Sequence, residues 1–133
     1  MGKTFIKIAV VYFAIGVLLG MTMGMIHDFR FTSLHAHVNL LGWVSTAVFG
    51  LIYSVYPYAA ETKLAKSHFW LHNIGLPVMM VGLLCESLGV TAGVPIMIVG
   101  SLAVVVGTLI FMVNVLKNLN TSSVQRANQD FKA

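Results

Sequence analysis

Residues 34–57 read LHAHVNLLGWVSTAVFGLIYSVYP, an apolar run that begins with two histidines one residue apart. About 20 apolar residues are needed for a helix to span a bilayer, so this run predicts a membrane-spanning helix over residues 34–56, ended by Pro57. An unpaired buried polar group costs roughly 1–3 kcal/mol, so His35 and His37 each require a partner. What those partners are is the first question that the sequence raises.

The rest of the chain is equally apolar. Of its 133 residues 58% are hydrophobic and only 9% are charged, whereas about 25% are charged in an ordinary soluble domain. Further apolar runs predict helices over 5–26, 67–88 and 95–116, joined by short connections that favour antiparallel neighbours. We therefore predict an all-α integral membrane protein with four transmembrane helices within residues 1–117. A polar tail is predicted over residues 118–133.

The basic residues predict how these helices are oriented. If the chain crosses the membrane four times, Arg30 lies on one side and all other lysines and arginines lie on the opposite side: Lys3, Lys7, Lys63, Lys66, Lys117, Arg126 and Lys132. The positive-inside rule then predicts that both termini are cytoplasmic, in a plasma membrane or bacterial inner membrane. These residues form no basic stripe interleaved with aromatics, so the net charge of +4 does not indicate nucleic-acid binding.

His35 and His37 are expected to point to nearly opposite sides of their helix. Residues two apart differ by about 200° around an α-helix, so these two cannot bind one metal ion together. Asn39, Gly42 and Thr46 are expected near the His35 side, where small residues leave room for a flat group such as a porphyrin. Each imidazole therefore either serves its own ligand or forms an interhelical hydrogen bond, and intramembrane ionisable residues are functional candidates by default.

The stretch quoted above resembles the tenth helix of subunit I of the haem–copper oxidases, especially the cbb3-type oxidases and nitric oxide reductases. SHFWLHNIGLPVMMVG, residues 67–82, resembles the next helix of that subunit. In that family the first histidine of the H-x-H motif binds the high-spin haem and the second binds the low-spin haem. The resemblance therefore implies that His35 and His37 each hold a different haem, with haem b as the default type. It also implies that the four helices pack like a quarter of that bundle.

Further residues would lie close to a haem held at the level of these histidines. Gly42, Trp43 and Thr46 would lie beside the macrocycle, with packing against a neighbouring helix as the alternative for Trp43. His27 and Arg30, in the outer loop, would contact the haem propionates, because arginine pairs well with carboxylates. For Arg30 a lipid headgroup is the alternative.

Two more histidines, His68 and His72, are expected to form interfacial or interhelical hydrogen bonds. At 1.5 Å per residue His72 would lie roughly 20 Å from the level of His37, too far for both to bind one iron. A role at a quinone headgroup remains the alternative for this pair.

The sequence also departs from the family. The copper ligands and the second ligand of the low-spin haem come from helices without a counterpart in this sequence, so we expect neither copper nor a complete oxidase. The implied function is that of a membrane b-type cytochrome that transfers electrons, with quinol or another redox partner left open. The alternatives are a haem-based gas sensor or haem carrier, and a non-haem assembly partner of a respiratory oxidase.

The resemblance also bears on assembly. Oxidase subunit I has twelve helices arranged in three arcs of four, so three copies of this chain would reproduce that number. We expect a homotrimer in which His35 of one protomer faces His37 of its neighbour across a shared haem. A twofold dimer is the alternative.

Overall fold

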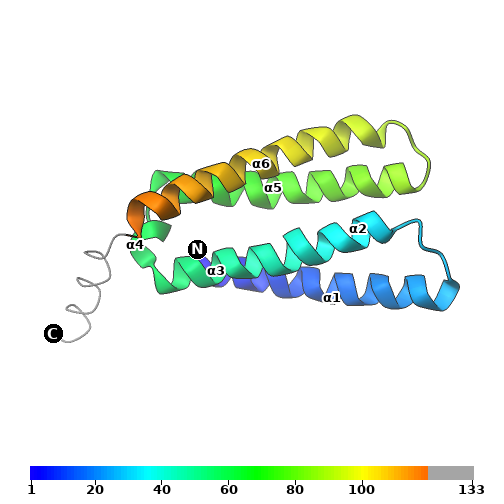
Figure 1. The fold of residues 1–133 in the computed structure, drawn as a ribbon, viewed down its shortest axis with the longest axis horizontal. Coiled ribbons are helices and arrows are strands. Elements are labelled where there is room, and N and C mark those ends of the chain that lie inside the picture. The colour runs from blue at the N-terminus through cyan, green and yellow to red at the C-terminus, as the bar shows by residue number, and fades with distance from the viewer. Residues whose placement is uncertain (120–133) are drawn as a thin grey trace.

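The computed structural model describes residues 1–119, and these are almost entirely helical (Figure 1). Four helical segments are long and apolar enough to cross a membrane, which confirms the four predicted spans. The elements are α1 (Gly2–Ile26), α2 (Thr32–His37), η1 (Val38–Ser45), α3 (Thr46–Val55), α4 (Pro57–Ala60), α5 (Lys63–Ser87) and α6 (Gly93–Asn118). The second span is continuous through α2, η1 and α3.

The predicted boundaries differ most at the third span. It begins at Lys63 rather than at residue 67, because the hydroxyl oxygen of Thr62 accepts a hydrogen bond of 3.0 Å from the Ala65 N–H and caps the helix. Pro95 lies in the first turn of α6, where its missing N–H costs nothing. Most of the tail predicted over 118–133 lies outside the described residues.

The helices form two antiparallel hairpins, one made by α1 with α2–η1–α3 and the other by α5 with α6 (Figure 1). Glycines bring α5 and α6 into close contact. A Cβ atom on Gly100 would overlap the backbone nitrogen of Met79, and one on Gly82 would overlap that of Met97. Small residues allow membrane helices to approach closely, so backbone packing rather than large side chains holds this hairpin together.

The glycine contact gives a direct test of the hairpin. Gly100→Ala should lower the stability by about 1–3 kcal/mol, because the new methyl group meets backbone atoms that cannot move without separating the helices. Gly24→Ala is the matched control, since a Cβ there meets no atom within 4 Å. Thermal unfolding in detergent measures both, and equal melting temperatures for the two variants would contradict this packing.

Two clusters of buried side chains join the hairpins, one at each end of the bundle. The cluster near the histidine pair of α2 is aliphatic and contains Leu34, Val38, Leu76, Met79, Met80, Leu83 and Val104. The cluster near α4 is largely aromatic and contains Phe5, Phe49, Tyr53, Ala59 and Ala65. The outer surface carries many exposed large apolar side chains, as expected for a surface that faces lipid.

The second span contains a π-helix, η1, directly after His37. Its i→i+5 hydrogen bonds put more residues into each turn than an α-helix has. Side chains beyond η1 are therefore rotated from the positions that a regular α-helix would give them. The prediction that Thr46 lies on the His35 side was wrong for this reason: Thr46 faces α5, where it contacts His72.

Candidate functional site

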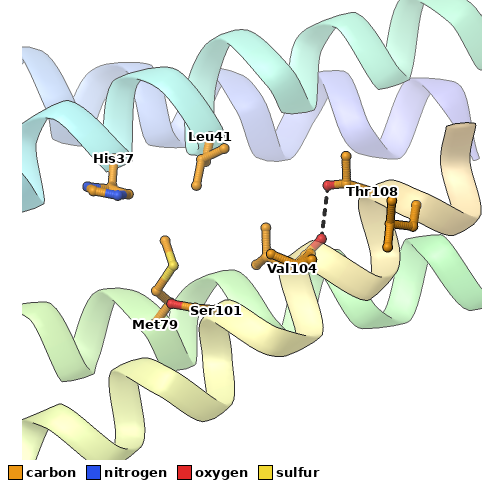
Figure 2. Close-up of a pocket in the computed structure, with 8 residues that line it drawn as sticks. His37, Leu41, Met79, Ser101, Val104 and Thr108 are labelled. Atoms are coloured by element: carbon orange, nitrogen blue, oxygen red, sulfur yellow. Dashed lines mark hydrogen bonds between the residues drawn. The ribbon is translucent and has the colours of Figure 1, made fainter.

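His35 and His37 lie on opposite sides of α2, as the sequence predicted. The imidazole of His35 rests against α1, where a Cβ on Gly20 would lie 2.7 Å from the His35 Cε1 atom. The imidazole of His37 points the other way, into a groove between α2–η1 and the α5–α6 hairpin (Figure 2). Both side chains are half-buried.

The His37 ring is held in one tautomer. Its Nδ1 atom lies 2.8 Å from the carbonyl oxygen of Ser33, one turn earlier. A carbonyl only accepts, so His37 Nδ1 carries the proton and Nε2 keeps its lone pair. Metal-binding histidines in general donate their other ring N–H to a carbonyl or carboxylate in this way, which fixes both the ring and its tautomer. His37 can therefore act as a ligand without any rearrangement.

The His37 groove has a volume of about 370 Å³, within the usual 300–1,000 Å³ of small-molecule sites. Its walls are almost wholly apolar, and the exposed side chains of Val105 and Leu109 leave it open toward the outside of the bundle. Met79 of α5 lies in the wall facing His37 (Figure 2). Residue spacing could not have indicated Met79, because α2 and α5 meet only in the folded chain. The full lining is His37, Leu41, Met79, Ser101, Val104, Val105, Thr108 and Leu109.

The tautomer of His35 is less firmly set. The side-chain nitrogen of Asn39 donates a 2.8 Å hydrogen bond to the His35 carbonyl oxygen and lies 3.3 Å from the ring atom Nδ1. The second distance exceeds the usual 2.7–3.2 Å, so Asn39 is bound chiefly to the backbone. His35 Nδ1 thus has a weak partner, and its ring can present either nitrogen as the acceptor.

The residues predicted to lie beside a macrocycle contact other residues of the same chain. Gly42 lies under the ring of Tyr12. Trp43 packs against Phe13 of α1 with ring centres 4.7 Å apart, which is the neighbouring-helix alternative raised for it. Thr46 is fully buried at its contact with α5.

The outer loop holds His27 and Arg30. His27 is exposed and ends α1 in the left-handed conformation. The Arg30 Nε atom donates to both carboxylate oxygens of Asp28, at 3.0 and 2.8 Å. These hydrogen bonds hold the pKa of the Asp28 carboxyl below its usual value, so the pair persists at neutral pH and is lost only as the pH falls through that lowered pKa. Arg30 would have to exchange this partner to bind another carboxylate.

His68 and His72 form the interhelical hydrogen bonds predicted for them. His68 Nδ1 lies 3.0 Å from the Tyr53 hydroxyl, and His72 Nε2 lies 2.8 Å from the Thr46 hydroxyl. Both histidines are almost fully buried, beside the aromatic cluster. They belong to another part of the bundle than the His37 groove.

Within residues 1–119 no three His, Cys, Asp or Glu side chains come together as a metal-ion site. Comparison of the chain with protein-family models, with curated proteins and with solved structures gives no match.

Proposed function

We propose that this chain is a small membrane b-type cytochrome, related to subunit I of the haem–copper oxidases, which transfers electrons through haem held by His35 and His37. The observation that carries the proposal is the state of His37. Its hydrogen bond to the Ser33 carbonyl leaves the lone pair on Nε2 available, and its side chain lines an apolar groove. A porphyrin supplies four of the iron's ligands itself. The imidazoles of His35 and His37 would supply the remaining two.

The groove fits this role in its chemistry. Bound haem supplies a one-electron couple, and the protein contributes the axial ligands and the polarity of the surroundings. Here His37 would provide the axial nitrogen, while Leu41, Val104 and Val105 would exclude water from one side of the macrocycle. The opening toward the outside of the bundle is where a neighbouring protomer would complete the site.

The opposed directions of His35 and His37 support a shared haem rather than a haem within one chain. In this proposal His37 would meet one neighbour across its open groove. His35, which rests against α1 and is half-buried in the single chain, would present the remaining edge of its ring to the other neighbour. In a closed ring each interface would then receive one His35 and one His37. This arrangement is why we favour a trimer over a dimer, which would leave half of these ligands unused.

The optical spectrum of the purified protein tests the proposal. We expect the spectrum of six-coordinate low-spin haem, identified as haem b by the pyridine haemochrome assay. Carbon monoxide should leave the reduced spectrum unchanged, since His35 and His37 would leave no open position on the iron. Rapid binding of carbon monoxide would instead support a gas sensor, and protein purified without haem that cannot be loaded with it would refute the cytochrome.

The proposed orientation places both termini in the cytoplasm and His35 and His37 near the opposite membrane surface. A reporter fused at the C-terminus should therefore read cytoplasmic, while one inserted within residues 27–31 should read external. The physical reason is the excess of lysine and arginine at the termini and around α4. The reverse pattern would move the proposed haem level to the cytoplasmic surface.

A further inference from the structure

Two buried imidazoles each have one nitrogen without a partner. His68 and His72 are 0% and 1% exposed, and their ring centres lie 5.8 Å apart. His68 Nε2 and His72 Nδ1 are buried and form no hydrogen bond in the structure. Leaving a buried polar atom without a hydrogen bond destabilises the folded protein, so two such atoms on adjacent turns of one helix call for a common explanation.

The proton on His72 can be placed by counting donors. Thr46 Oγ1 donates its only hydrogen to the Leu41 carbonyl oxygen at 2.7 Å. Its 2.8 Å contact with His72 Nε2 must therefore be a bond that it accepts. His72 thus carries its proton on Nε2, and the unpartnered Nδ1 is an acceptor.

The proton on His68 follows from its contact with Tyr53. The Tyr53 hydroxyl lies 3.0 Å from His68 Nδ1, and within residues 1–119 this ring nitrogen is the acceptor that the hydrogen-bond geometry offers to the hydroxyl hydrogen.

The Tyr53 hydroxyl therefore donates its hydrogen to His68 Nδ1. His68 in turn carries its proton on Nε2, so its unpartnered atom is a donor.

We propose that one water molecule bridges His68 Nε2 and His72 Nδ1, accepting from the first and donating to the second. The two orphaned atoms are complementary, one donor and one acceptor, which a water molecule satisfies together. A metal ion would need lone pairs on both. Buried waters in proteins typically occupy such positions between polar groups that otherwise lack partners. This site does not depend on haem binding.

The bridged chain of hydrogen bonds runs in one direction. From Tyr53 it passes through His68, the water, His72 and Thr46, and each group donates to the next until Thr46 donates to the Leu41 carbonyl. The chain therefore fixes the tautomers of both histidines and ties α3 to α5 through the interior of the bundle.

Nuclear magnetic resonance of the ¹⁵N-histidine-labelled protein in bilayers tests both parts of the proposal. We expect His68 and His72 to be neutral with the proton on Nε2. We also expect strong magnetisation transfer from water to both rings although neither is exposed. Absence of that transfer would exclude the water, and a proton on Nδ1 of His68 would reverse the donor pattern on which the bridge rests.

Two matched variants separate the directed hydrogen-bond chain from simple packing. Thr46→Val removes the acceptor of His72 Nε2–H at nearly constant volume, and we expect the His72 tautomer to shift toward Nδ1–H. Thr46→Ser keeps the hydroxyl and should retain the wild-type ¹⁵N shifts. An unchanged His72 tautomer in Thr46→Val would overturn the assignment of the chain. Neither variant changes His35 or His37, so haem content reports separately on the proposed cytochrome.

Discussion

Replacing His37 with alanine is expected to remove nearly all haem from the purified protein. The substitution deletes the imidazole whose Nε2 lone pair faces the groove. Loss of a group that only orients a metal ligand already costs 10–100-fold in metal affinity, so loss of the ligand itself should exceed about 100-fold. His35→Ala should have the same effect, because the shared iron would lose its other axial nitrogen. Haem per chain, measured by pyridine haemochrome, gives the result directly.

Two controls accompany these variants. His68→Ala should lower stability, since it empties a fully buried site beside Phe5, yet it should keep most of the haem. Equal haem loss from His35, His37 and His68 variants would mean that the haem lies elsewhere. Met79→Leu replaces the thioether opposite His37 by a side chain of similar size. Retention of haem there supports the histidine of a neighbouring protomer as the second ligand, whereas its loss would favour ligation by Met79 within one chain.

The second prediction with a large effect concerns assembly: we expect a trimer with one haem per chain. The native mass of the protein in detergent, after subtraction of the detergent, should be three times the 14.4 kDa of the chain. Haem removal should dissociate this assembly, because a ligand bound across an interface stabilises it by mass action. Native mass spectrometry with and without haem measures mass and stoichiometry together.

The possible stoichiometries lead to different conclusions. A dimer with one haem per two chains would keep the shared haem but replace the ring by a twofold axis. A monomer with a full complement of six-coordinate haem would refute sharing altogether, and the Met79→Leu variant would then identify the second ligand. In the His37→Ala variant, a trimer that persists without haem would show that helix packing, rather than the cofactor, holds the chains together.

The sequence predicts the long-range pattern of this fold well, because apolar runs of the right length leave few alternatives. It places four spans, and it places His35 and His37 on opposite sides of α2. The start of α5 was misplaced because the Thr62 cap extends a helix through residues that are not apolar. The predicted position of Thr46 was wrong because the α-helical period of 3.6 residues does not hold through η1.

The surroundings of each histidine could not be predicted in the same way. His68 and His72 were expected to form interfacial or interhelical hydrogen bonds, but the sequence did not indicate which residues would be their partners. These are Tyr53 and Thr46 of the second span. The His37 groove likewise combines residues from three helical segments. Such contacts depend on how far each helix is rotated, which the residue pattern of a single span does not specify.

The π-helix gives the second span a reserve of rotation between its two ends. Below it, α3 is fixed by the contact of Gly50 with α1 and by the bond of Thr46 to His72. Above it, α2 carries His35 and His37. Converting η1 to regular α-helix would turn these imidazoles relative to α3, and it would also turn Leu34 and Val38, which are buried in the aliphatic cluster. The Leu41 carbonyl that ends the buried hydrogen-bond chain lies within η1 itself. The direction of His37 is therefore coupled both to the packing between the hairpins and to the buried histidines of α5.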